Sequence, residues 1–242
     1  IRQDLRSKLK VVDGMITIPV KMKMTRKVTD FYQHSPFPNY NDFQTKQDLI
    51  RNIEKNSFLK DLKNSIGFNK SFLEVGSGTS QLSLALASGT NNLVVALDPT
   101  KQSLELGKIF AKKNNIRNVC FLNADVFDDP CSPEFFDYVW CSGVLHHTID
   151  SEKGFKIISK YVKPGGLIFI GLYNKYSRLR TNIRQTIYNL SGRSKFGEKL
   201  VRLMDPYLRR NLDYKKDLAW FRDQYEHPVE RKHTLDEVLK WF

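Results

Sequence analysis

Two glycines in the segment Phe72–Gln81 (FLEVGSGTSQ) mark a turn that could hold a ligand. An apolar run precedes Gly76 and a helical pattern follows Gly78, so the turn joins a buried strand to a helix. Glycine allows the backbone to approach a ligand, and a helix N-terminus presents free N–H groups. Asp98 lies 22 residues beyond Gly76, where a carboxylate commonly accepts hydrogen bonds from ribose hydroxyls. The spacing therefore predicts a site for a cofactor that contains adenosine.

Two further positions narrow the choice of cofactor. The dinucleotide fingerprint G-x-G-x-x-G would place its third glycine at Gln81, and this chain has none there. Glu74, two residues before the first glycine, would repel a pyrophosphate but favour the ammonium of an amino acid. S-adenosylmethionine (SAM) carries an amino acid and a sulfonium without a phosphate, so the pattern favours SAM over NAD.

A third acid and a loop extend the same expected site. Asp125 and Val126 follow another strand-like run, where an acid could accept the adenine amino group. The alternative is that Asp125 only caps a turn or a helix. Ser142 and Gly143 leave a fourth run, at the sheet edge where parallel folds bind ligands. Asp137, inside that run, is expected to support the fold.

Three side chains at this edge are candidates for catalysis: His146, His147 and Tyr173. Methyl transfer displaces a leaving group in line, and the protein must align the nucleophile, exclude water and sometimes remove a proton. Histidine suits proton removal because it titrates near neutral pH. The alternative for both histidines is a structural hydrogen bond that closes the loop.

Candidate substrate contacts lie in aromatic segments outside the strands. Residues 31–43 hold five aromatic side chains and two prolines, which predicts a lid whose tyrosine faces attract a sulfonium. Packing of Phe31, Phe37 and Phe43 on the core is an equal alternative. A second polar and aromatic cluster covers residues 223–233, without a convincing metal spacing, so no metal is expected. The candidates for substrate contact are Tyr32, Tyr40, Asn174, Tyr225 and His227.

The elements that must position these residues follow from hydrophobic periodicity. Strands are predicted at 71–75, 93–97, 119–122, 136–141 and 167–172, the last after a tight turn at 164–166. Helices are predicted at 45–62, 82–87, 103–113, 152–162 and 238–242, the last after a capping box at Thr234. Strands that alternate with helices indicate an α/β fold. We expect a Rossmann-like, doubly wound, mostly parallel sheet with helices on both faces.

This pattern divides the chain into four parts. Residues 1–66 form an N-terminal extension and lid, with a strand-like stretch at 15–19, and residues 67–174 form the cofactor-binding core. Residues 175–233 form a helical insertion after the fifth strand, or a substrate cap, and residues 234–242 the last core helix. Because the chain begins with Ile and stops inside that helix, we expect it to be truncated.

Composition excludes several classes of protein. The chain is 40% hydrophobic and 12% aromatic, which supports a packed core and argues against disorder. Its longest apolar runs are strand-length, which predicts no transmembrane segment. Cys120, Cys131 and Cys141 lack C-x-x-C spacing, which argues against a disulfide framework or zinc site and favours a cytoplasmic location.

The net charge of +13 is concentrated in the flanks. Residues 1–30 hold eight basic and three acidic side chains, and residues 175–242 hold sixteen and nine. The block between them is nearly neutral, with fifteen basic and fourteen acidic side chains. Such flanks could attract a phosphate-bearing substrate, RNA or an anionic membrane surface. Solubility alone is an equal alternative.

Residues 71–172 resemble the class I SAM-dependent methyltransferases. The glycine motif, the ribose acid, the adenine acid, the loop GVLHHT (143–148) and the turn VKPGG (162–166) occur in that family's order. The branch resembled most is that of the ubiquinone/menaquinone methyltransferase-like enzymes. The flanking segments SPFPNYN (35–41), GLYN (171–174) and DQYEHP (223–228) resemble a bacterial subfamily of uncharacterised methyltransferases.

The resemblance implies a role for each matching residue. Glu74, Gly76, Ser77 and Gly78 would hold the methionine end of SAM, and Thr79 belongs to the same turn. Asp98 would hold the ribose, Asp125 and Val126 would frame the adenine with Pro99 nearby, and Ser142 and Gly143 would pass under the cofactor. Ser80 departs from the family, which often has a third glycine there, so the first helical turn is expected to lie slightly farther away. The chain also ends before the last two strands usual in such folds.

The leading hypothesis is methyl transfer from SAM to an O or N nucleophile of a small or lipid-like metabolite, with S-adenosylhomocysteine as the product. RNA methylation, in particular of tRNA, is the rival, because of the basic C-terminal flank. A non-catalytic SAM-binding protein is a third possibility. An NAD-linked oxidoreductase is a distant fourth, because the glycine pattern fits it poorly.

Overall fold

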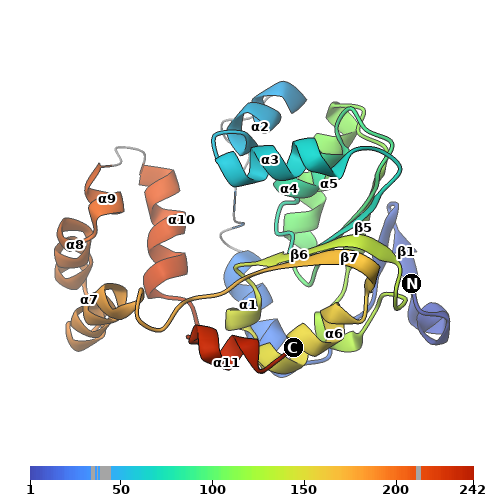
Figure 1. Ribbon diagram of the computed structural model, residues 1–242. Coiled ribbons are helices and arrows are strands. Elements are labelled where there is room, and N and C mark those ends of the chain that lie inside the picture. The colour runs from blue at the N-terminus through green and yellow to red at the C-terminus, as the bar shows by residue number, and fades with distance from the viewer. Residues whose placement is uncertain (34–35, 37, 39–44, 211–213) are drawn as a thin grey trace.

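A seven-stranded sheet with helices on both faces forms the centre of the molecule (Figure 1). The computed structural model describes residues 1–33, 36, 38, 45–210 and 214–242. The strand order is β1-β2-β5-β4-β3-β6-β7, and all neighbours are parallel except β1 and β2. The predicted doubly wound, mostly parallel fold is confirmed.

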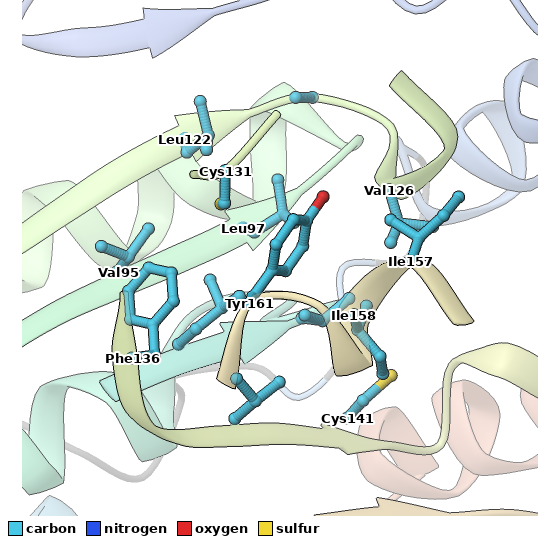
Figure 2. Close-up of a cluster of buried hydrophobic side chains, with 14 of the residues drawn as sticks. Val95, Leu97, Leu122, Val126, Cys131, Phe136, Cys141, Ile157, Ile158 and Tyr161 are labelled. Carbon is cyan, nitrogen blue, oxygen red and sulfur yellow. The ribbon is translucent and has the colours of Figure 1, made fainter. Parts of the chain in front are cut away.

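All five predicted strands are present. The first four agree to within one residue at each end, and the fifth begins at Val162 instead of residue 167. The five are β3 (Ser71–Val75), β4 (Leu93–Asp98), β5 (Val119–Asn123), β6 (Phe136–Ser142) and β7 (Val162–Gly171). Their buried side chains alternate between two faces: Phe72 points to one cluster, and Leu73 and Val75 to the other. Figure 2 shows the second cluster, in which Tyr161 lies among side chains that include Leu97, Phe136 and Ile158. This core fixes the strand ends that carry the site.

The predicted tight turn before the last strand is instead an irregularity inside β7. Val162 pairs with Phe136, but the next pair is Leu167 with Tyr138, so residues 163–166 lie opposite one residue of β6. Gly165 has a φ of +79°, and a Cβ on Gly166 would come within 2.8 Å of the Asp137 carbonyl. The two glycines therefore allow a bulge where the sequence predicted a tight turn.

Asp137 links the amino-terminal ends of two neighbouring strands. Its carboxylate accepts hydrogen bonds from the amide and hydroxyl of Ser71, both 2.7 Å long, and pairs with Lys163 at 3.2 Å. Burial opposes ionisation, but the bonds from Ser71 and Lys163 prevail and hold the pKa of Asp137 at about 2. These contacts fit the structural role expected from the sequence.

We expect Asp137→Asn to lower the free energy of unfolding at pH 7 by about 1–2 kcal/mol, the loss of charged hydrogen bonds at a partly exposed site. The folded pKa lies below the ordinary value of 3.8, so this contribution is present above about pH 4 and is lost as the pH falls toward 2. Urea unfolding of both proteins at pH 7 and pH 2.5 measures it. If the two proteins differed in unfolding free energy as much at pH 2.5 as at pH 7, the ionised Asp137 carboxylate would not be the source of the stabilisation.

The N-terminal region contributes a hairpin and a helix. Strands β1 (Lys10–Val12) and β2 (Met15–Thr17) enclose Asp13 and Gly14, both with positive φ, and β2 extends the sheet by pairing with β5. A 3₁₀ helix, η1 (Gln3–Lys8), precedes them. Helix α1 (Lys23–Gln33) lies in the N-terminal extension, where no helix was predicted before residue 45. The segment 39–44 of the expected lid lies outside the described residues.

The helices that cover the sheet correct the sequence prediction in two places. The helix predicted at 45–62 is two helices, α2 (Lys46–Ile53) and α3 (Ser57–Ile66), because Asn56 caps a new helix by accepting from the Leu59 amide. The final helix, α11 (Leu235–Leu239), begins directly after its cap Thr234, three residues before the predicted start. The remaining covering helices are α4 (Gln81–Ala87), α5 (Lys101–Lys113) and α6 (Ser151–Ser159).

Four helices form a group beside the sheet (Figure 1). They are α7 (Leu179–Leu190), α8 (Lys195–Met204), α9 (Pro206–Arg210) and α10 (Tyr214–Tyr225). A small core of Tyr188, Val201, Leu208, Phe221 and Tyr225 holds them together. The predicted helical content of residues 173–233 is therefore confirmed. α10 brings polar residues back toward the carboxyl ends of the strands.

Candidate functional site

The glycine turn between β3 and α4 has an unusual backbone. Gly76 and Gly78 have φ values of +68° and +53°, and Ser80, which precedes α4, has +64°. A Cβ on Gly76 would come within 2.2 Å of Val144 Cγ2, so only glycine fits there. Ser80 thus adopts a conformation that glycine would take more easily, at the position where the resemblance implies a glycine.

A cavity of about 630 Å³ lies at the carboxyl ends of the strands. The carboxylates of Glu74, Asp98 and Asp125 all line it, so the structure brings together three acids that are spread over 51 residues of sequence. The other predicted cofactor residues that line the cavity are Gly76, Ser77, Gly78, Pro99, Val126, Ser142 and Gly143. Thr79 does not line it; its buried hydroxyl donates to the Pro38 carbonyl instead.

Glu74 is held by the first turn of α4. Its Oε2 accepts from the amide (2.9 Å) and hydroxyl (2.5 Å) of Ser83, while Oε1 has no hydrogen-bond partner within the described part of the chain. Burial raises the pKa of Glu74 to about 7, against the opposing effect of the Ser83 bonds. A buried carboxylate in this state is stabilised by any cation that enters the cavity.

Asp98 and Asp125 are fixed by backbone amides. Asp98 accepts from the amides of Gly78 (2.8 Å) and Thr100 (2.7 Å), and burial raises its pKa. Asp125 accepts from the Phe127 amide (3.0 Å) and from the hydroxyl of Thr25 in α1. Asp125 also caps the 3₁₀ helix η2 (Val126–Asp128), as the alternative interpretation of the sequence predicted. It therefore both caps a helix and lines the cavity.

The loop after β6 carries the two adjacent histidines in a 3₁₀ helix, η3 (Leu145–His147). His147 lines the cavity, and its Nδ1 lies 2.6 Å from the Val229 carbonyl. His146 is buried behind it, stacks on the ring of Tyr173 at 3.8 Å, and accepts from the Tyr173 amide. Burial, with His147 and Arg178 nearby, lowers the pKa of His146 to about 2.

The far half of the cavity is polar and aromatic. The Tyr32 hydroxyl in α1 donates to Asp223 in α10 (2.7 Å), which joins two helices 191 residues apart. The Gln224 amide donates to the Tyr173 hydroxyl (3.1 Å). Arg178 lies over the Tyr173 ring, 3.9 Å from its centre. Tyr32 and Tyr173 were predicted here and line this half, together with Asp223 and Gln224.

Three of the predicted substrate contacts within the described residues are not brought to the cavity wall. Asn174 accepts from the amides of Tyr176 and Ser177 and so closes a turn. Tyr225 donates to Asp205 inside the α7–α10 core. His227 packs its ring 3.6 Å from His147, and burial together with His147 lowers its pKa to about 3. Tyr40 lies outside the described residues.

Sequence reasoning missed several cavity residues. Met24, Thr25 and Val28 line it from α1, and their spacing with Tyr32 is that of one helix face, a signal present in the sequence. Arg178 and Trp220 also line the wall, and no local pattern marks them, because only the packing of α7 and α10 brings them there.

The described residues offer neither a metal site nor a membrane-spanning helix. No group of three or more His, Cys, Asp and Glu side chains among them converges as metal ligands would. None of the helices within the described ranges combines the length and the apolar composition needed to cross a bilayer.

A family model for a methyltransferase domain matches residues 66–219, which is more than half of the chain. The chain belongs to this methyltransferase family. The Rossmann-like sheet and the glycine turn are those of the class I SAM-dependent methyltransferase superfamily, which confirms the resemblance seen in the sequence.

Curated relatives of this methyltransferase domain include two ubiquinone biosynthesis O-methyltransferases. The protein of Neisseria meningitidis is 30% identical over 109 residues, which cover 44% of this chain and 45% of that one. The protein of Vibrio atlanticus is 28% identical over 138 residues, covering 57% of this chain and 53% of that one. The chain thus spans about half the length of these relatives.

Solved structures show the same fold. PKMT2 from Rickettsia typhi, in complex with AdoHcy, has a TM-score of 0.58 at 20% identity, covering 71% of this chain and 37% of that one. Magnesium protoporphyrin IX methyltransferase (ChlM) from Synechocystis PCC 6803, with bound SAM, has a TM-score of 0.50 at 15% identity, covering 64% of this chain and 78% of that one. At these identities the likeness concerns the fold.

The charge of the cavity in this methyltransferase domain fits SAM. In the described part of the chain, no cationic side chain pairs with Glu74, Asp98 or Asp125, although all three are buried. Arg178, the cation in the described wall, is paired with Glu230 at 2.6 Å. A ligand with a sulfonium and an ammonium would supply the missing positive charge, whereas a pyrophosphate would add to the negative charge.

We expect SAM to bind more tightly as the pH rises through about 7, because a cationic ligand favours ionised Glu74 and the carboxyl must otherwise release its proton on binding. Calorimetry between pH 6 and pH 8, in buffers of different ionisation enthalpy, measures the released proton. In Glu74→Gln the part of the pH dependence of SAM affinity that comes from Glu74 should disappear. The part that comes from the amino group of SAM should remain. An identical pH dependence in the variant would contradict this assignment.

Proposed function

We propose that this chain transfers a methyl group from SAM to an O or N nucleophile of a small or lipid-like metabolite, with S-adenosylhomocysteine as the second product. The observation that carries the proposal is a single cavity with two chemically different halves. One half holds three carboxylates beside the glycine turn, and the other is polar and aromatic. The two relatives described above are named as O-methyltransferases of ubiquinone biosynthesis, which supports a lipid-like acceptor.

Each residue of the first half has a role toward SAM in this proposal. Asp98 accepts the ribose hydroxyls with the lone pairs that Gly78 and Thr100 leave free, and Asp125, with Val126 and Pro99 beside it, frames the adenine. Glu74 and the turn Gly76–Gly78 hold the amino acid end. Ser142 and Gly143 pass beneath the cofactor. SAM, when bound, supplies a methyl group already activated on a sulfonium.

The second half binds and orients the acceptor. Tyr32, Tyr173 and Asp223 offer hydroxyl and carboxylate groups, and Trp220 offers an aromatic face. Because Glu230 neutralises Arg178, this half carries the net negative charge of Asp223. It therefore favours a neutral or cationic acceptor over a phosphate-bearing one. In this proposal α1 acts as part of the lid, α7–α10 act as the substrate cap, and the protein works in the cytoplasm.

We expect Asp98→Ala to weaken SAM binding by about 1–3 kcal/mol, since it removes charge-assisted hydrogen bonds to the ribose. Calorimetry measures the dissociation constant, and thermal melting checks that the turn still folds. Glu105→Ala, which removes an exposed carboxylate on α5 that pairs with Lys101, is the matched control and should bind SAM normally. Unchanged affinity in Asp98→Ala would show that the ribose lies elsewhere.

Calorimetry with SAM and with NAD tests the class of cofactor. We expect SAM to bind and NAD to bind weakly or not at all, and tight NAD binding without SAM binding would overturn the proposal. Radiolabelled methyl transfer into an organic-solvent extract of bacterial cells then tests turnover. SAM binding without any turnover would favour a non-catalytic SAM-binding protein.

RNA methylation is the second candidate, favoured by the basic residues 175–242. Several of these side chains, including Arg180, Lys199 and Arg210, are exposed on α7–α9. Filter binding of bulk tRNA at increasing salt concentration separates the two candidates. Affinity that falls steeply with salt would favour RNA, because each neutralised phosphate releases counterions.

A further inference from the structure

Three imidazole rings meet at the wall of the cavity. His147 lies between His146, at 4.3 Å between ring centres, and His227, at 3.6 Å. The Nε2 atoms of His146 and His227 are enclosed and have no hydrogen-bond partner in the described residues. Nε2 of His147 is not enclosed in this way, and His147 alone of the three lines the cavity as described. The geometry therefore distinguishes His147 from its neighbour in the sequence.

The Val229 carbonyl fixes the tautomer of His147. A carbonyl oxygen only accepts, so the contact of 2.6 Å places the ring proton of His147 on Nδ1. The neutral ring has one N–H, which leaves a lone pair on Nε2. His146 is the opposite case. Its Nδ1 accepts from the Tyr173 amide at 3.2 Å, so its proton is on Nε2.

Arg231 ties the segment that carries this carbonyl to the histidine loop. The Arg231 amide donates to the His146 carbonyl (2.8 Å). Its guanidinium donates to the carbonyls of Thr148 (3.1 Å) and Ile149. These bonds hold the residues before and after His147 in the sequence. They thereby fix the loop against the segment of Val229, which lies 82 residues from His147 in the chain. A change at Arg231 would therefore be felt at the Val229–His147 contact although Arg231 itself does not line the cavity.

We propose that Nε2 of His147 accepts the proton of an acceptor hydroxyl during methyl transfer, and that Arg231 is a positioning residue that holds the Val229 carbonyl against Nδ1. This inference rests on the proposed function and narrows the acceptor to a hydroxyl-bearing one. The hydroxyl oxygen forms a bond to the methyl carbon, and the carbon–sulfur bond breaks with both electrons going to sulfur. The hydroxyl proton passes to Nε2, so the positive charge moves from sulfur to the imidazolium, which later releases the proton to solvent.

The charges around His147 suit this step. Asp223 of α10 and Glu230 face the ring and would stabilise the imidazolium, whereas Arg178 opposes it. Burial outweighs the attraction and lowers the pKa of His147, so the ring is neutral and able to accept a proton at neutral pH. The other facing groups, namely His146, His227 and the Tyr173 ring, are uncharged at that pH.

Nitrogen NMR of ¹⁵N-histidine-labelled protein tests the tautomer without any acceptor. His147→Gln assigns the His147 signals by their loss, and His146→Gln assigns those of His146. We expect opposite tautomers in the two adjacent residues: protonated Nδ1 in His147 and protonated Nε2 in His146. We also expect His147 to stay neutral when the pH falls from 8 to 6.5, the ordinary pKa of histidine. Protonated Nε2 in His147, or an imidazolium at neutral pH, would overturn the inference.

Arg231→Ala tests the positioning role. We expect the His147 signals to become those of a tautomer mixture, while His233, which bonds to Glu237 and Ser151 away from the cavity, keeps its signals. Arg180→Ala, at an exposed arginine of α7, is the matched control and should leave His147 unchanged. If His147 kept a single unaltered tautomer in Arg231→Ala, Arg231 would not be a positioning residue for His147.

Phenol tests the hydroxyl assignment directly. Added to protein saturated with S-adenosylhomocysteine, phenol should shift the Nε2 resonance of His147, and toluene, which lacks the hydroxyl, should not. A resonance that phenol leaves in place would contradict the assignment. SAM calorimetry on the same samples distinguishes failure of the proposed function from failure of this inference. Absence of SAM binding would refute the proposed function, whereas normal SAM binding with the wrong His147 tautomer would refute only this inference.

Discussion

Gly76→Ala should raise the dissociation constant for SAM at least about thirtyfold. The left-handed backbone at Gly76 costs an alanine about 1–2 kcal/mol, and overpacking against Val144 costs about 1–3 kcal/mol more. Relief of either strain moves the turn that would hold the amino acid end of SAM. The two costs add up to about 2–5 kcal/mol, which corresponds to a thirtyfold or larger loss of affinity, measured by calorimetry.

Gly89→Ala is the matched control for this variant. Gly89 has a similar φ of +74°, but a Cβ there would meet no atom within 4 Å. The control therefore carries the backbone strain without the collision and without a place in the cavity, and it should bind SAM normally at some cost in stability. Equal SAM affinity in both variants would show that Val144 moves aside and that the turn does not need glycine.

His147→Gln should lower the maximal rate of methyl transfer by about 10²–10⁴-fold, the usual worth of a positioned general base. The Michaelis constant for SAM should change little, because the carboxylates at the other half of the cavity remain. Radiolabelled transfer over a range of SAM concentrations up to saturation measures both constants. His233→Gln, a buried histidine outside the cavity wall, serves as the control for the loss of an imidazole.

The pKa of His147 determines in which direction the rate should change with pH. The pKa of His147 lies below its ordinary value, and the neutral ring is the form that accepts a proton. The rate of the unaltered protein at saturating SAM should therefore stay level as the pH falls from 8 to 6.5 and decline only below that. A decline centred above pH 6.5 that persists in His147→Gln would show that another group limits the reaction.

Local periodicity was enough to predict the five strands from β3 to β7 and the wall of the cavity that carries the three carboxylates. Strand β3, the glycine turn and Asp98 are adjacent in a short stretch of sequence, and parallel strands bring their carboxyl ends to one edge whatever the loops do. The positions of Glu74, Asp98 and Asp125 in one cavity follow from this rule. The rule holds because backbone hydrogen bonding between strands leaves little freedom at those ends.

The half of the cavity proposed to bind the acceptor was less predictable because it depends on long-range packing. The Tyr32–Asp223 bond and the contact between His147 and Val229 join residues 191 and 82 positions apart, and no local pattern encodes such a pairing. Tyr225 was expected near substrate, but its hydroxyl satisfies Asp205 in the small core of α7–α10. Helix α1 was missed because Thr25, Val28 and Thr29 are β-branched and lower its helix propensity.

The hydrogen bond between Tyr32 and Asp223 has a consequence for how specificity can change. The wall that would hold SAM is built mainly from the ends of β3, β4, β5 and β6, with Thr25 of α1 bonded to Asp125. The opposite wall includes Trp220, Asp223 and Gln224 of α10, which lies outside the sheet. In the proposed function, replacement of α10 would alter which acceptor is bound and would leave the carboxylates at the strand ends in place. New acceptors could then be accommodated by exchange of this helix while the sheet stays unchanged.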